Sequence, residues 1–159
     1  MTYEPQPVSD RDPIPALQQI REALDCTAVF LSHAGQAQHV VAAEVGLDRL
    51  GAQPLKSLSE DSLPGAVRAM NYPMVIDNVH AHPAVADRAL CLRQGICGYL
   101  GVPVMCAGTG ACCGTLSAVT GRPRHWSMQD TGLLLACAAR FGRSGSLAWS
   151  GLPQGRTRS

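Results

Sequence analysis

The segment 97–121, which reads CGYLGVPVMCAGTGACCGTLSAVTG, is the part of this sequence that most constrains how the chain can fold. Its two halves are rich in strand-forming residues, and the short stretch Ala107-Gly108-Thr109-Gly110 separates them. Strand-like runs on both sides of such a turn predict a β-hairpin. Successive side chains of a strand point to opposite faces. One face is therefore aliphatic and carries Leu100, Val102, Val104, Leu116 and Ala118. The other face carries Tyr99, Gly101, Pro103, Thr115, Ser117 and Val119.

Neither face of this hairpin carries a charged side chain. A sheet face that meets water normally carries Lys, Glu or Arg, so we expect both faces to be covered, the second by loops or helices over a cavity. A cavity for a small ligand needs a few hydroxyl groups among small side chains. This makes Tyr99, Gly101, Thr115 and Ser117 candidate ligand-binding residues. The alternative is a tightly packed core in which each hydroxyl bonds to the backbone.

A helix is predicted near the N-terminus. Leu17, Ile20 and Leu24 recur at helical spacing after Asp12-Pro13, which offers an N-cap followed by a first-turn proline. We expect this helix to end at about Asp25.

A second terminal helix is predicted from Ser127 to about Phe141, with Gly142 as its stop. The sequence Ser127-Met-Gln-Asp130 resembles a capping box with Asp in place of Glu. Residues 133–139 are apolar on nearly every side, and such a helix must be buried on more than one face. We expect one side to contact the sheet and another to contact a partner helix. That partner is either the N-terminal helix or a second protomer in a homodimer.

The remaining elements are short. Composition and turn residues predict strands at 26–32, 38–45 and 74–76, a loop at 46–56, a helix from Ser62 to about Met70, and a weakly helical segment at 84–93. Residues 1–12 and the Gly/Ser/Arg-rich residues 143–159 are expected to be flexible, which leaves one domain at 13–142.

Composition excludes several classes of function. Thirteen Lys and Arg residues against twelve Asp and Glu residues lack the basic excess that nucleic-acid binding requires, so we expect no nucleic-acid partner. No apolar run approaches the roughly 20 residues that span a bilayer, and residues 1–13 do not resemble a signal peptide. The sequence therefore predicts a soluble, cytoplasmic domain with no membrane partner. Its seven cysteines include no C-x-x-C pair, and buried thiols in a reducing compartment are the favoured interpretation. Adjacent strand side chains point to opposite faces, which argues against a bond between Cys112 and Cys113.

A family resemblance comes from several short motifs. The string Tyr99-Leu-Gly-Val-Pro-Val104, then Gly114-Thr-Leu116 and Pro123-Arg-His-Trp-Ser127 before a helix, resembles the last third of a GAF domain. The resemblance extends upstream through Ser62-Leu-Pro-Gly-Ala-Val67, Pro73-Met-Val-Ile-Asp77 and His82-Pro83, and covers roughly residues 13–142.

The resemblance implies an α/β (α+β) fold with a central antiparallel sheet, terminal helices on one face and a ligand-covering lid of loops and short helices on the other. It implies a sensory or regulatory module that binds a small molecule between sheet and lid, signals through its terminal helices to an output domain and often dimerises. It implies no enzyme activity and no particular cofactor. Segment 84–93 falls where the family has its variable lid.

Asp77, His80 and His82 form the densest polar cluster beside the expected pocket. One carboxylate and two imidazoles can ligate a metal, but Asp77 ends a strand where an Asx turn is useful, so we expect no metal site. Contact of these side chains with an organic ligand is the preferred functional interpretation.

The resemblance also leaves specialised alternatives. The free methionine-(R)-sulfoxide reductases carry catalytic cysteines before a similar strand, and Cys91 and Cys97 fall only loosely near those positions. Haem-binding members have a proximal His between the His-Pro segment and the Tyr-Leu-Gly-Val-Pro strand, and no His occurs at 88–96. His80 or His82 could replace that ligand. Chromophore-binding members have a Cys-His pair, which this sequence lacks. The cyclic-nucleotide motif is not recognisable.

Overall fold

The computed structural model of the chain describes residues 12–34, 38–50, 57–59, 62–82, 95–106, 108 and 110–144. The helices and strands are α1 (Ile14–Leu24), β1 (Ala28–Ala34), β2 (Gln38–Val45), the 3-10 helix η1 (Leu47–Leu50), β3 (Ser57–Ser59), α2 (Leu63–Met70), β4 (Met74–Ile76), the 3-10 helix η2 (Val79–Ala81), β5 (Gly98–Met105), β6 (Cys112–Thr120) and α4 (Met128–Ser144). Segments 1–11, 83–94 and 145–159 lie outside the described residues. The expected flexibility of residues 1–12 and 143–159 therefore concerns segments that are mostly outside this range, and the predicted lid segment 84–93 and Cys91 lie outside it as well.

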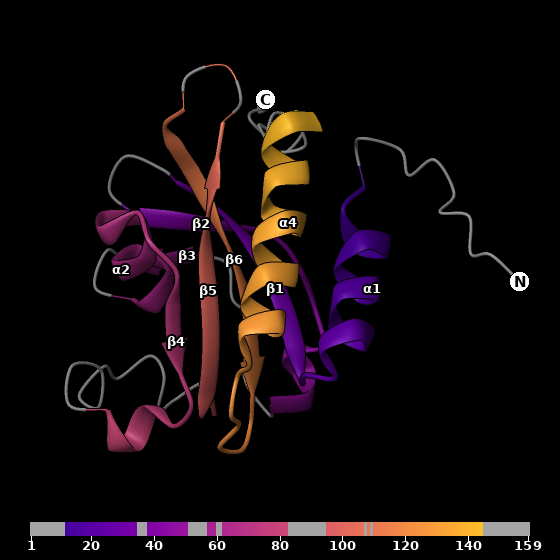
Figure 1. Cartoon of the computed structure of the whole chain (residues 1–159), viewed down its shortest axis with the longest axis vertical. Helices are drawn as coiled ribbons and strands as arrows, with labels where there is room; N and C mark the ends of the chain where they lie inside the picture. The colour runs from indigo at the N-terminus through magenta and orange to yellow at the C-terminus, as the bar shows by residue number, and fades with distance from the viewer. Residues whose placement is uncertain are drawn as a thin grey trace, which may run out of the picture.

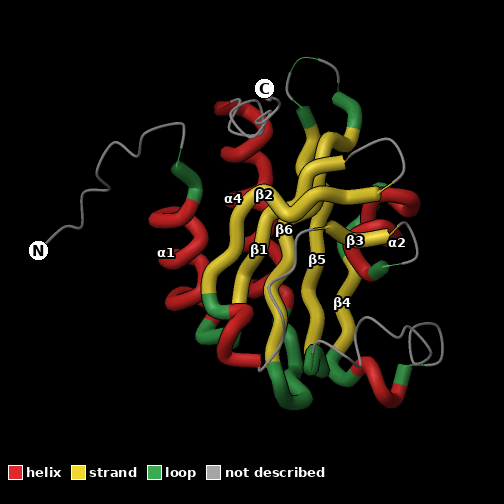
Figure 2. Tube along the Cα trace, turned by 180° about the vertical axis from the view of Figure 1, so that it is seen from behind, coloured by secondary structure: helices red, strands yellow, loops and turns green. Residues whose placement is uncertain are grey.

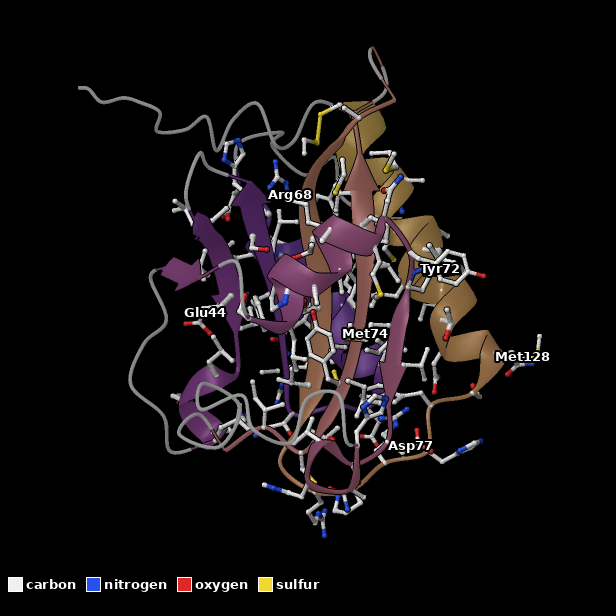
Figure 3. All side chains as sticks on the ribbon, turned by 90° about the vertical axis from the view of Figure 1, so that its left-hand side faces the viewer. Glu44, Arg68, Tyr72, Met74, Asp77 and Met128 are labelled. Atoms are coloured by element: carbon white, nitrogen blue, oxygen red, sulfur yellow. A yellow bond between two sulfur atoms is a disulfide. The ribbon has the colours of Figure 1, made fainter. Side chains whose placement is uncertain are left out.

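The described strands form one antiparallel sheet in the order β3-β2-β1-β6-β5-β4. Helices α1 and α4 lie on one face of it, and α2 lies over the other (Figures 1 and 3). From behind, Figure 2 shows the strands in front of α4, while α1 lies to one side, next to β1. The predicted mixed fold with terminal helices on one face is confirmed.

The two faces of the sheet are buried in two separate clusters. Both helices of the first face contribute to one cluster, whose main members are Leu17, Ile20, Leu24, Leu100, Val102, Val104, Leu116, Ala118, Leu134, Ala138 and Phe141. The second cluster joins α2 to the opposite face and includes Phe30, Leu63, Val67, Ile76, Tyr99 and Val119. The assignment of alternate hairpin residues to two covered faces is therefore confirmed.

The helix boundaries match the sequence signals with small differences. Pro13 is the N-cap residue of α1, and the carboxylate of Asp12 accepts a hydrogen bond from the N–H of Ile14 at 3.1 Å. At α4, the N–H of Ser127 donates to Asp130 Oδ2 at 2.9 Å and the N–H of Asp130 donates to Ser127 Oγ at 3.0 Å, which is the predicted capping box.

Two expectations about element boundaries were wrong, and one strand was not predicted. Helix α4 does not stop at Gly142 but continues to Ser144, because Gly142 lies against the backbone of Met105 and does not adopt a left-handed conformation. Segment 46–56 was expected to be a loop but contains η1. Strand β3, with the sequence SLS, pairs with residues 38–40 at the sheet edge and is too short to give a periodic signal.

Candidate functional site

Tyr99 and Ser117 lie on the α2-facing side of the sheet, and both are fully buried. Their hydroxyl oxygens are 2.8 Å apart and share a hydrogen bond. Gly101, two residues further along β5, pairs with Ser117 across the hairpin. A Cβ added at Gly101 would lie 2.7 Å from the Cε2 and Cζ atoms of Tyr99, so the tyrosine ring lies directly over the glycine. The Tyr99 ring therefore fills the space that a side chain at position 101 would occupy.

A second hydroxyl pair lies beside the first. Thr115 is two residues before Ser117 on β6 and pairs in register with Ser32 of β1. Both side chains are fully buried, and Ser32 Oγ shares a short hydrogen bond with Thr115 Oγ1. Ser32 was not among the predicted site residues, although the alternation of strand 26–32 and its hydroxyl group were the available signals.

A cross-strand row of the α2-facing side runs from a charged residue at one margin to an apolar residue at the other. Ser117 lies in one cross-strand row with Phe30 and Glu44 on one side and Gly101 and Met74 on the other. In Figure 3, Glu44 and Met74 lie at the two sides of this face, with α2 and Arg68 between them. Glu44 accepts a hydrogen bond from the N–H of Leu47 at 3.2 Å. This face, with two buried hydroxyl pairs at its centre and partly exposed Glu44, Arg68 and Met74 around them, is the candidate site.

Asp77 connects the end of β4 to the segment that precedes α4. Its Oδ1 accepts a hydrogen bond from the N–H of Trp126 and its Oδ2 lies 3.2 Å from Nδ1 of His125. Its backbone carbonyl accepts from the N–H of Arg124, and the indole N–H of Trp126 donates to the carbonyl of Ile76 at 3.1 Å. The structure thus uses both carboxylate oxygens of Asp77 to hold the entry to α4.

His80 and His82 lie in and after η2. His80 is exposed, and its N–H donates to Asn78 Oδ1 at 3.0 Å. His82 is partly buried, and its Nδ1 is a buried atom without a hydrogen-bond partner among the described residues. The described residues contain no group of three or more His, Cys, Asp and Glu side chains that could hold a metal ion. The structure does not bring His80 or His82 together with the hydroxyl pairs through any described hydrogen bond.

The described cysteines are in two chemical states. Cys97 is buried, its thiol donates to Asn78 Oδ1 at 3.4 Å, and burial raises its pKa. Cys106 and Cys113 are joined in a disulfide, so the expectation of free thiols throughout was wrong for these two. Cys112 remains a free thiol, in agreement with the argument against a Cys112–Cys113 bond. The error arose because the pairing depends on an irregularity in strand register that composition does not reveal.

With this geometry established, comparison with known proteins identifies the family. The model of the GAF domain family matches residues 15–144. The chain belongs to the GAF domain family. No curated protein matches it in a sequence comparison.

Solved structures of other GAF domains share the fold. The GAF domain of an Acinetobacter phosphoenolpyruvate-protein phosphotransferase has a TM-score of 0.71 and 20% identity over 91% of this chain and 85% of that one. The type II free methionine-R-sulfoxide reductase from Thermoplasma acidophilum has a TM-score of 0.70 and 17% identity over 84% of this chain and 89% of that one. A Synechocystis GAF domain in its photoproduct state has a TM-score of 0.67 and 20% identity, covering 93% of this chain and 100% of that one. At these identities the similarity shows a shared fold.

This GAF domain belongs to a sensory and regulatory family. Among the described residues, none of the helices has the length and apolar character that a membrane span requires. Its sheet separates two layers: buried hydroxyl pairs and α2 on one side, α1 and α4 on the other.

Proposed function

We propose that this GAF domain is a sensor module that binds a small molecule on the α2-facing side of its sheet. The strongest support is a set of four buried hydroxyl groups, arranged as two hydrogen-bonded pairs, on the α2-facing side of the sheet. No charged side chain of β1, β5 or β6 lies among them. A fully packed apolar core has no need of such groups, whereas a small-molecule site uses a few polar groups among apolar ones to orient its ligand. Ser32, Tyr99, Thr115 and Ser117 contribute these groups. The absence of a side chain at Gly101 leaves room for the Tyr99 ring.

Strand β6 provides the route from this site to the terminal helices. Its alternate residues face opposite layers, with Thr115 and Ser117 on the candidate site and Leu116 and Ala118 in the cluster that includes α1 and α4. A ligand that moves the hydroxyl pairs therefore moves a strand on which α1 and α4 are packed. An output domain connected to either helix would receive this change.

Two conservative variants on β6 test the location of the site. Ser117→Ala and Ala118→Gly each remove one heavy atom from a fully buried position on the same strand, but on opposite faces. Native mass spectrometry of protein purified directly from cells measures the fraction that retains a small molecule. We expect Ser117→Ala to reduce this fraction and Ala118→Gly to leave it close to that of the parent protein. Equal retention by both variants, or retention lost only in Ala118→Gly, would contradict this location.

A homodimer through the terminal helices is part of the same proposal. Leu134 is fully buried against the sheet, whereas its neighbours Leu133 and Leu135 are 37% and 39% exposed on α4. Ile14 of α1 is 40% exposed. A second copy of the two helices would cover these side chains. Light scattering is expected to show a dimer for the parent protein and a folded monomer for Leu135→Glu. Leu134→Glu, the matched control, is expected to unfold, and a parent protein that is monomeric at all concentrations would refute the dimer.

A thiol-dependent reductase is the second candidate function, because the Thermoplasma reductase shares the fold. Burial and a raised pKa make Cys97 a poor nucleophile in the folded protein. We therefore expect no turnover of free methionine sulfoxide in the presence of a dithiol reductant. Turnover that disappears in Cys97→Ser would reverse this preference. An absorption spectrum of the same protein preparation tests for haem or another chromophore.

A further inference from the structure

Three cysteines lie at the turn end of the β5–β6 hairpin, next to the loop that joins the two strands. Cys106 follows β5, and Cys112 and Cys113 begin β6. The Cα atoms of Cys106 and Cys113 are 5.9 Å apart and their sulfur atoms are bonded, whereas Cys112 is free. Figure 3 shows the bond in yellow near the end of the hairpin, where it adjoins α4. The site therefore contains a disulfide and an adjacent thiol in one short segment.

An irregularity in strand register brings the two bonded cysteines together. Val104 pairs with Gly114 and Met105 pairs with Cys112, so Cys113 is an extra residue on β6 and forms a β-bulge. The turn is closed by hydrogen bonds from the N–H of Cys106 to the carbonyl of Ala111 and from the N–H of Gly110 to the carbonyl of Cys106, both 2.8 Å. These backbone hydrogen bonds hold Cys106 opposite the bulge.

The cysteines at the hairpin end are partly accessible to thiol reagents. Cys106, Cys112 and Cys113 are all partly exposed, as is Cys137 on α4, whereas Cys26 and Cys97 are buried. Burial raises the pKa of Cys26 to about 11 and also raises the pKa of Cys97 and of Cys137 on α4. Since the thiolate is the reactive form, these three cysteines are poor nucleophiles in the folded protein, whereas the hairpin end presents a disulfide and a free thiol that are both partly exposed.

The hairpin end also contacts the last turns of α4. A Cβ at Gly142 would lie 3.0 Å from the carbonyl carbon of Met105 and 3.6 Å from Cγ1 of Val104, so the helix backbone lies against the residue next to Cys106. Phe141 is buried in the first core cluster, against which Cys113 also packs. A change in the position of residues 104–106 is therefore transmitted directly to α4.

We propose that Cys106 and Cys113 form a reversible thiol–disulfide exchange site that controls how tightly the last turns of α4 are held on the sheet. The reductant is a dithiol, whose first thiolate attacks one sulfur of the bond, forms a mixed disulfide and releases the other cysteine as a thiol. The second thiol of the reductant then displaces the remaining cysteine and closes its own disulfide. In total, two electrons and two protons pass to Cys106 and Cys113, and an oxidised dithiol reverses the reaction. This site lies apart from the hydroxyl pairs and requires no small-molecule ligand on the α2-facing side.

The first experiment follows the sulfur atoms in the full chain. The folded protein is equilibrated with mixtures of reduced and oxidised dithiothreitol and quenched with acid, then unfolded in guanidinium chloride at neutral pH in the presence of excess N-ethylmaleimide, so that buried free thiols are labelled as well. It is then fully reduced and labelled with iodoacetamide. Trypsin places Cys97, Cys106, Cys112 and Cys113 in one peptide, 94–124, because the Arg122–Pro123 bond resists cleavage. Fragmentation of this peptide reports each cysteine separately.

The expected result is that Cys106 and Cys113 change label together as the mixture becomes oxidising, while Cys97 and Cys112 stay labelled by N-ethylmaleimide. Cys112→Ser, the matched control next to the bond, is expected to preserve this titration. Cys106→Ser is expected to leave Cys113 permanently reactive. The proposal is overturned if both cysteines remain reactive in the most oxidising mixture, if Cys112 replaces one of them, or if the bond resists every reducing mixture in which the protein stays folded.

The second experiment measures the effect on α4 by hydrogen–deuterium exchange. Amides at 138–144 are expected to exchange about fivefold faster in the reduced protein than in the oxidised protein, whereas amides of α1 serve as an unchanged reference. Cys106→Ser should show the faster rate under both conditions, and Cys112→Ser should respond like the parent protein. Equal exchange at 138–144 in both redox states would overturn the control of α4.

Discussion

The substitution Gly101→Ala tests whether the Tyr99 ring occupies the space over β5. The new Cβ would lie 2.7 Å from two ring carbons, which is too close for either group to stay in place. The ring must then move, and its hydrogen bond to Ser117 is lost. Unpaired buried hydroxyls cost about 1–3 kcal/mol and an overpacked core costs about 1–3 kcal/mol. Replacing glycine by alanine in a strand by itself raises the unfolding free energy by about 0.5–1 kcal/mol, because glycine loses more backbone entropy on folding. The expected net loss of unfolding free energy is about 3 kcal/mol.

Urea unfolding measures this loss directly. With a slope of about 2 kcal/mol per molar urea, the midpoint should fall by about 1.5 M without a change in slope. Gly132→Ala is the matched control, because Gly132 is exposed on α4 and a Cβ there meets nothing within 4 Å. The same change at Gly132 should raise stability by about 1 kcal/mol through helix propensity.

A double variant separates the ring contact from other causes. In Tyr99→Leu the ring atoms that meet the new Cβ are gone, so adding Gly101→Ala should cost little beyond Tyr99→Leu alone. The reasoning is refuted if Gly101→Ala shifts stability by less than about 0.5 kcal/mol, or if its full cost persists in the Tyr99→Leu background.

Three further predictions concern the entry to α4. Ser127→Ala removes one half of the capping box and should lower the unfolding free energy by about 1 kcal/mol in urea; an unchanged midpoint would argue against the box. Burial alone would raise the pKa of Asp130, but the hydrogen bonds from Ser127 and the charge of Arg124 outweigh it and lower the pKa from its ordinary value of 3.8. The stability that this carboxylate provides is present above that value and is lost as pH falls through the lower folded-state pKa, so Asp130→Asn should flatten the acid side of a stability–pH curve. A curve as steep as that of the parent protein would contradict this. Trp126→Phe leaves the buried carbonyl of Ile76 without its indole donor and should cost about 1–3 kcal/mol by thermal unfolding, whereas a loss of a few tenths would show that another donor replaces it.

Local signals in the sequence predicted the elements that surround the candidate site. The alternation of aliphatic and small polar residues in 97–121, without charges, was sufficient to assign its two faces and to require a cover on each. The capping box at Ser127 was predictable because both partners lie within one helical turn.

Long-range contacts could not be predicted in the same way. Ser32 and Thr115 are 83 residues apart, and their pairing depends on β1 lying beside β6. The position of Tyr99 over Gly101 depends on a side-chain rotamer, which alternation does not specify. Asp77 was expected beside a ligand, but its bonding partners come from a segment 48 and 49 residues further along the chain.

The central pairing of the sheet also determines when this domain can fold during synthesis. Strand β1 lies in the middle of the sheet because β6 pairs with it, from Ala28↔Val119 to His33↔Gly114. A nascent chain that ends before β6 therefore has β1 at an open edge of the sheet. Such a chain cannot form either hydroxyl pair, because Thr115 and Ser117 are on β6, and it lacks helix α4, which covers one face of the sheet. Contacts between such distant residues slow folding, and exposed strand edges promote aggregation. Ribosome-bound chains truncated before residue 112 should consequently remain sensitive to protease, and compact folding should begin only when the whole β5–β6 hairpin has left the ribosome.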